Sequence, residues 1–218
     1  MGEAVESLYL PVLEAIVARL SVTGGALDHI EQNWADGSAY QACELVTLNL
    51  RLVCELILLG SVAAHVHDAG LSLSDTKWRP KDAFAELAKV NEHPLPFPIA
   101  LHLNKNGIGQ HHADPVSQPI SYVALSRVYG VCSDLLHAPT LRSVVDGRLP
   151  SFDVAQLRQW HTGFMEIMKA HALMLPERKI ILLCCWSGKA DEKPMSFKLN
   201  AMGPSSLDIA ALPEFSLL

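Results

Sequence analysis

LVTLNLRLVCELILLGSVAAHV, residues 45–66, is the stretch that decides the fold of this chain. It is apolar over a length that exceeds the roughly 20 residues a helix needs to cross a bilayer. Asn49, Arg51 and Glu55 lie near its middle, however, and polar or charged side chains are costly in lipid. The stretch therefore predicts a buried helix of a soluble protein over about residues 39–67, with no membrane association.

Four further helices are predicted around this one from apolar periodicity, capping residues and prolines. Gly24-Gly25 is expected to end the first helix, and Pro139 and Pro176 are expected to stop the third and fourth. The predicted segments are residues 4–20, about 80–91, 121–137 and 152–174.

Two β-type segments follow the helices. Residues 179–187 form an apolar run, and residues 195–201 alternate between apolar and polar side chains. The polar turn at residues 188–194 makes the pair a β-hairpin, which has to pack on the helices or pair with another strand. A long proline-rich and polar connection lies near residues 92–120, with a short strand predicted near 99–103.

The fold prediction is a mainly α protein, a bundle of four to six helices with a C-terminal β-hairpin. We expect a single domain over residues 1–218, with the bundle at 1–175, a long loop near 92–120 and the hairpin as an appendage at 179–202. Hydrophobic residues make up 50% of the chain and charged residues 18%, which is typical of a globular protein with a sizeable core.

Composition also bears on location and partners. Five cysteines without a C-x-x-C spacing argue against a zinc ribbon or a disulfide scaffold and favour the reducing cytoplasm. The first residues hold no basic segment, so no signal peptide is expected. The net charge of −6 speaks against a surface that coats nucleic acid broadly. Residues 76–200 nevertheless carry a net +4, which is compatible with a local basic face or with an ordinary mixed surface.

YGVCSDLLH, residues 129–137, contains the clearest candidate site. Tyr129, Ser133 and His137 are spaced four apart, so on a helix they lie along one face, each about 40° on from the last. Such a row on an apolar helix is typical of a buried polar network or of part of a site. Cys132 lies about 140° from His137, so the two cannot act as nucleophile and base, and we expect Cys132 to be a packing residue.

Two other groups of polar residues were considered as sites. Arg51 and Glu55 are four residues apart on the long helix and can pair, either holding the bundle in register or lining a pocket. Histidines at 65, 67 and 111–112 are metal-ligand types, but His65 and His67 point about 160° apart on a helix. The chain has no mechanistic metal or nucleotide motif, so we expect neither a metal nor a cofactor.

The order of these features resembles the HEPN-like superfamily, the "higher eukaryotes and prokaryotes nucleotide-binding" helical bundles. Residues 49–56, then Trp78, the prolines of 94–98 and residues 129–137 look like the succession in an uncharacterised group of bacterial proteins. That group is related to abortive-infection and toxin-type members. The resemblance covers about residues 40–140 and implies a helical bundle, a homodimer and a role in bacterial defence or stress.

Many HEPN proteins are metal-independent ribonucleases, and their signature is an arginine followed by a histidine after four to six residues. This chain departs from that signature. Arg127 is ten residues before His137, and Arg158 is three residues before His161. The missing spacing favours a protein without ribonuclease activity.

The first functional hypothesis is therefore a non-catalytic interaction or ligand-sensing module. Its ligand-binding residues would be Arg51, Glu55 and Trp78. Its expected partner is a second copy of the chain, an RNA or another protein.

The alternative hypothesis is a degenerate HEPN-type ribonuclease built on His137, Ser133 and Tyr129. His137 would act as general acid or base at a ribose 2′-hydroxyl, and a donated arginine would stabilise the phosphate. The candidate donors are Arg51, Arg127 and Arg142. A metal-dependent hydrolase that uses the loop histidines is a more distant third.

Overall fold

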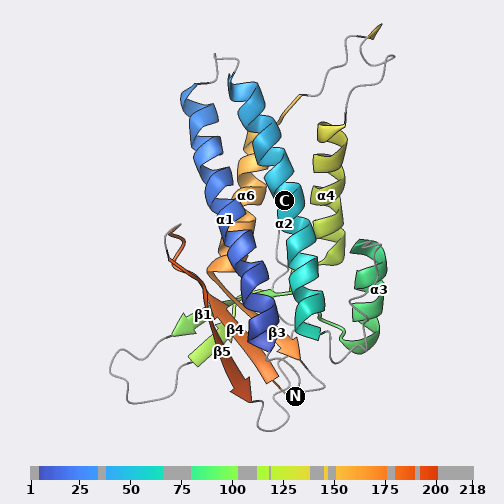
Figure 1. Cartoon of the computed structure of the whole chain (residues 1–218), viewed down its shortest axis with the longest axis vertical. Coiled ribbons are helices and arrows are strands. Elements are labelled where there is room, and N and C mark those ends of the chain that lie inside the picture. Colours follow the sequence, from blue (N-terminus) through green and yellow to red (C-terminus); the bar gives the residue numbers. More distant parts are fainter. Residues whose placement is uncertain are drawn as a thin grey trace.

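The computed structural model of the chain consists of long helices standing on a small antiparallel sheet (Figure 1). It describes residues 5–33, 38–65, 80–102, 112–117, 119–137, 145–146, 151–175, 180–189 and 192–200. The prediction of a mainly helical protein with antiparallel strands in its C-terminal part is confirmed.

The helices place α2 at the centre of the molecule. They are α1 (Val5–Gln32), α2 (Ser38–His65), α3 (Pro80–Val90), α4 (Tyr122–Leu136) and α6 (Val154–Lys169). α2 contacts each of the other four helices. Figure 1 shows it in front, flanked by α1 and α4, with α6 behind. The helix predicted over about residues 39–67 is thus the element that organises the fold.

The first helix is longer than its sequence indicated. Gly24-Gly25 was expected to end it, but α1 continues to Gln32. A Cβ atom at Gly24 would lie 3.4 Å from the imidazole of His161 on α6. The glycine therefore lets α6 approach α1 closely, and the packing that results keeps the helix intact against the cost of glycine in a helix interior.

The sheet has five strands in the order β2-β1-β3-β4-β5, and every pair of neighbours is antiparallel. The strands are β1 (Phe97–His102), β2 (His112–Pro115), β3 (Ala170–Leu175), β4 (Ile180–Cys185) and β5 (Met195–Asn200). The predicted hairpin is present as β4 and β5, with Ile180 opposite Asn200 and Cys185 opposite Met195. It is one edge of a larger sheet, because β3 and the strands of the proline-rich connection complete it.

The helix predicted over 152–174 is wrong at its end. α6 stops at Lys169, and β3 begins at the next residue and pairs with β4 along its whole length. The run AHALML is short and apolar, and such a run fits a buried strand as well as a helix. Pairing with β4 decides between the two, and no local pattern reports that partner.

The turn between β4 and β5 is closed by Trp186. Its indole N–H lies 2.9 Å from the carbonyl oxygen of Lys189 and 3.1 Å from that of Glu192. Gly188 has a φ of 86°, a conformation that residues with a Cβ rarely adopt. The backbone N–H of Trp186 also donates to the carbonyl of Lys169 at 2.8 Å, which ties the hairpin to the end of α6.

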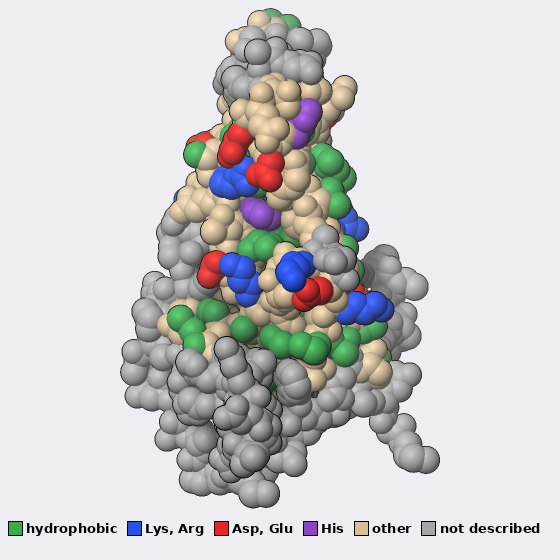
Figure 2. Space-filling model, turned by 90° about the vertical axis from the view of Figure 1, so that its left-hand side faces the viewer, with side chains coloured by type: hydrophobic (Ala, Val, Ile, Leu, Met, Phe, Trp, Pro, Cys, Tyr) green, Lys and Arg blue, Asp and Glu red, His purple; other side chains and the backbone are tan. Residues whose placement is uncertain are grey.

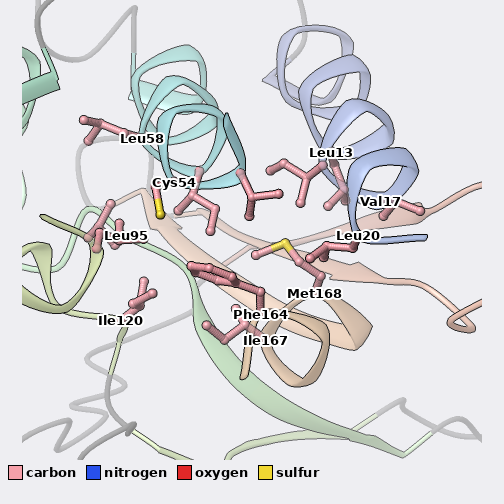
Figure 3. Packing of buried hydrophobic residues seen from close by; sticks show 14 of the residues in the cluster. Leu13, Val17, Leu20, Cys54, Leu58, Leu95, Ile120, Phe164, Ile167 and Met168 are labelled. Atoms are coloured by element: carbon pink, nitrogen blue, oxygen red, sulfur yellow. The ribbon is translucent and has the colours of Figure 1, made fainter. Parts of the chain in front are cut away.

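The core lies between α1, α2 and α6 (Figure 3). The close-up shows side chains from these three helices pointing toward one another: Leu13, Val17, Leu20, Cys54, Leu58, Phe164, Ile167 and Met168. Leu95 and Ile120, from the connections that flank α3 and α4, close the same cluster. Each fully buried side chain of this size contributes about 1.5–3 kcal/mol relative to exposure.

Two of the described helices, Ser7–Gln32 and Ser38–His65, are long and apolar enough to cross a membrane by length and composition alone. Core helices of soluble proteins pass the same test. In the apolar window of α2, 61% of the residues are buried inside the fold, against 33% in that of α1. The apolar character of α2 is therefore largely used in packing.

Candidate functional site

The 129–137 stretch forms the second half of α4 and its C-terminal cap. The helix begins at the N-cap Ser121, whose hydroxyl accepts the backbone N–H of Ala124 at 3.1 Å. At the other end, the backbone N–H of His137 donates to the carbonyl of Ser133 at 3.1 Å, and Nδ1 of the imidazole also contacts that carbonyl. His137 is exposed and bonds to the backbone of Ser133, so its ring serves the helix end.

Tyr129 and Arg51 meet where α4 packs on α2. Nη2 of Arg51 donates to the Tyr129 hydroxyl at 3.3 Å, and the guanidinium carbon lies 5.1 Å from the centre of the tyrosine ring. Nε of Arg51 lies 3.5 Å from a carboxylate oxygen of Glu55, and the side chains of this pair are 32% and 27% exposed. The predicted pair of Arg51 and Glu55 therefore exists, and it lies in the same cluster as Tyr129.

Two polar atoms of this cluster have no hydrogen-bond partner within the described part of the chain. They are the buried Nε of Arg51 and the buried Oγ of Ser133. The separation of Nε from Glu55 is longer than a hydrogen bond, so the two groups interact as charges. Ser133 faces the cluster as predicted, but its hydroxyl is not bonded to His137.

The thiols beside the cluster are inert. Burial raises the pKa of Cys132 to about 12, although the positive charge of Arg51 opposes the effect. Burial also raises the pKa of Cys54 well above its usual value, with smaller contributions from Cys132 and Glu55. Both thiols stay protonated at neutral pH and pack between α2 and α4.

The residues predicted for catalysis are only partly brought together. Tyr129 and Ser133 lie at the α2–α4 contact with Arg51, whereas His137 is at the exposed end of the helix. Arg127 is also exposed. Among the residues that the structure describes, no arginine is hydrogen-bonded to His137. Two predicted site residues, Trp78 and Arg142, lie outside the described residues.

The histidines considered as metal ligands divide in the same way. His67 and His111 lie outside the described residues. His65 is buried at the C-terminal end of α2, with Nδ1 2.7 Å from the carbonyl oxygen of Ser61. In the described ranges, no three His, Cys, Asp or Glu side chains converge as a metal site would require.

A buried polar junction between the helices and the sheet was missed by the sequence analysis. The Tyr9 hydroxyl lies 2.7 Å from Nε2 of His171 on β3, and both residues are buried. Asn91 donates from its amide to His65 Nε2 at 2.9 Å and to the carbonyl of Met174 at 2.9 Å. We call these residues the polar junction: Tyr9, His65, Asn91 and His171, with the Met174 carbonyl.

His171 is the most perturbed group of the junction. Desolvation lowers its pKa to about 4, against the opposing effect of the backbone carbonyls of Ile167 and Met168. Its Nδ1 has no partner that satisfies hydrogen-bond geometry within the described residues. Gly60 makes room for this arrangement, because a Cβ there would lie 2.9 Å from the ring of Tyr9. The only sequence signal was a polar side chain in an apolar run.

Charged and histidine side chains also gather on the outer face of α1 and α6 (Figure 2). Arg158 of α6 binds Asp28 and Glu31 of α1, with nitrogen–oxygen distances of 2.9 and 2.8 Å. One turn further on, Nε2 of His161 lies 3.0 Å from the carbonyl oxygen of Leu20, and burial lowers the pKa of His161. These contacts clamp α6 onto α1 and use Arg158 in an ion pair.

The outer face of α2 leaves a row of leucines in solvent. Leu45, Leu48 and Leu59 are 44%, 42% and 36% exposed, and Leu52 and Leu56 between them are half-buried. At about 100° per residue, all five lie within about 40° of Leu52 around the helix axis. We call this row the leucine face: Leu45, Leu48, Leu52, Leu56 and Leu59.

Comparison of the chain with models of protein families, with curated proteins and with solved structures gave no match. The resemblance to HEPN-like proteins therefore stays a prediction.

Proposed function

We propose that this protein is a non-catalytic helical module that acts by binding a protein partner. The observation that carries the proposal is the leucine face of α2, where a row of large apolar side chains is left exposed. Single exposed leucines are ordinary on a soluble protein, but a contiguous row on one helix face is typical of a helix that binds another helix.

The arrangement of the polar residues supports the same proposal. Cleavage of RNA by a histidine and an arginine needs both groups at one ribose phosphate. His137 bonds to the backbone at the end of α4, whereas Arg51 is engaged by Glu55 and by the ring and hydroxyl of Tyr129. We assign Arg51, Glu55 and Tyr129 a structural role in holding α4 against α2.

The resemblance noted above adds the cellular setting to the proposal. As a HEPN-like protein the chain would work in the bacterial cytoplasm, within a defence or stress system. Neither the buried thiols nor the polar surface of α1 and α6 conflicts with that setting.

The proposal is tested by incubating the purified protein with a mixed RNA pool in EDTA, alongside a His137→Ala variant. We expect no cleavage by either protein, measured as the loss of full-length RNA on a denaturing gel. Cleavage by the wild type that is lost in the variant would contradict the proposal and establish the ribonuclease alternative. An Arg51→Ala variant would then show whether Arg51 is the donated arginine.

A further inference from the structure

We infer that the partner of the leucine face is a second copy of this chain, bound antiparallel about a two-fold axis that passes Leu52. The inference rests on the proposed function and names its partner. It is argued from the spacing of the leucines, from the charges beside them and from what the rest of α2 already contacts.

The spacing of the leucine face is the same in both directions along the helix. Leu48 and Leu56 are each four residues from Leu52, and Leu45 and Leu59 are each seven residues from it. A two-fold interface uses the same patch on both subunits, so the patch has to match its own reverse. In an antiparallel pair, Leu52 meets Leu52 of the partner subunit, and Leu45 meets Leu59 of the partner subunit.

Charges on one flank of the face fit the same symmetry. Arg51 and Glu55 lie on the α4 side of the leucine face and are 32% and 27% exposed. The two-fold places like flanks together and maps each position onto its mirror about Leu52. Arg51 then lies within about 3 Å, measured along the helix axis, of the level of Glu55 of the partner subunit, at a rise of about 1.5 Å per residue. Opposite charges therefore meet across the interface, and like charges are kept apart.

The rest of α2 leaves this face as the available one. α2 is in contact with α1, α3, α4 and α6, and it also contacts β3. Its inner residues, such as Leu50 and Val53, are fully buried by these contacts. The polar pair of Arg19 and Asn49, joined by a 3.0 Å hydrogen bond, borders the leucine face on the α1 side. The face is thus an apolar strip between two polar edges, as expected for the centre and rim of an interface.

The first test is the molar mass of the wild type, of Leu52→Glu and of Val123→Glu by sedimentation equilibrium. Val123 is 75% exposed on α4 and lies outside the leucine face, so it is the matched control. We expect dimers for the wild type and Val123→Glu and a monomer for Leu52→Glu, with unchanged helical circular dichroism in all three. A monomeric wild type would overturn the inference, as would a Leu52→Glu variant that stays dimeric.

A second test reads the orientation and uses conservative variants that keep the fold. Leu52→Cys should form a disulfide-linked dimer under mild oxidation, and Leu45→Cys should link to Leu59→Cys only when the two are mixed. The wild type, whose described cysteines are buried or half-buried, is the control. Linking of Leu45→Cys to itself would indicate a parallel pair and overturn the antiparallel arrangement.

The two proposals fail separately. A wild type that is monomeric and cleaves no RNA removes the dimer and leaves a module with another partner. RNA cleavage that depends on His137 removes the proposed function whatever the molar mass. A monomer that floats with phosphatidylcholine vesicles would instead assign the leucine face to a lipid surface and overturn the dimer.

Discussion

On the inner side of α2, Leu50 and Val53 have no exposed surface, whereas on the outer side Leu45 and Leu48 keep 44% and 42% of theirs. The two sides of the helix are similar in composition. Only the inner side is needed to join α1, α4 and α6, so the same residue type has two roles on one helix. The lesson is that apolar residues beyond those the core requires are the ones to examine for function.

A pair of neighbouring leucines tests this comparison with the largest expected effect. Leu50→Ala should lower the free energy of unfolding by about 2–5 kcal/mol, because it opens a cavity in the core. Leu48→Ala makes the same chemical change two residues away on the exposed side. It should cost less than about 1 kcal/mol in a monomeric background such as Leu52→Glu. Urea unfolding at a fixed protein concentration measures both, and equal losses would contradict the division of α2 into two sides.

The polar junction gives the next effect, which depends on pH. The pKa of His171 is about 4 in the folded protein and 6.5 is its ordinary value, so below about pH 6.5 the unfolded chain binds the proton and the folded chain does not. Stability should fall as the pH drops from about 6.5 toward 4, by about 3 kcal/mol for this group alone.

The contribution of His171 is isolated by comparing the wild type with His171→Gln. Other groups titrate in both proteins, including His161, whose pKa is also lowered by burial. The difference in unfolding free energy between the two proteins should therefore shrink between pH 7 and pH 4. A difference that does not change with pH would show that His171 is not held neutral in the folded state.

Two tyrosine-to-phenylalanine changes give the smallest contrast, between the polar junction and the α2–α4 cluster. Tyr9→Phe leaves the buried Nε2 of His171 without its partner and should cost about 1–3 kcal/mol. Tyr129→Phe removes a 3.3 Å hydrogen bond in a half-buried site and should cost less than about 1 kcal/mol. Thermal unfolding of both variants compares them directly. A larger loss for Tyr129→Phe would give the α2–α4 cluster more weight than its contacts indicate.

The parts of the fold that could be predicted are those specified by local pattern. α2 was expected over about 39–67 and lies at Ser38–His65, because its apolar run is long and its start is marked. The hairpin of β4 and β5 was predicted from alternation and a polar turn. By contrast, the continuation of α1 past Gly24 and the start of β3 depend on α6 and β4, which are distant in sequence.

The site shows the same limit. The pair of Arg51 and Glu55 follows from a spacing of four residues, and the structure contains it. Tyr129 is 78 residues from Arg51, and His171 is 162 residues from Tyr9, so no spacing reports either contact. The sequence pointed to His137 because of its place in a motif, whereas the most perturbed histidine of the described chain lies on a strand that was taken for a helix.

The most direct test of the two-sided role of α2 is the unfolding temperature of the wild type and of Leu52→Ser at low and high protein concentration. A dimer is stabilised by mass action, so its midpoint rises with concentration. We predict a rise for the wild type and a constant midpoint for Leu52→Ser, with the two proteins converging at low concentration. A wild-type midpoint that does not depend on concentration, or a variant that is equally destabilised at every concentration, would contradict the account.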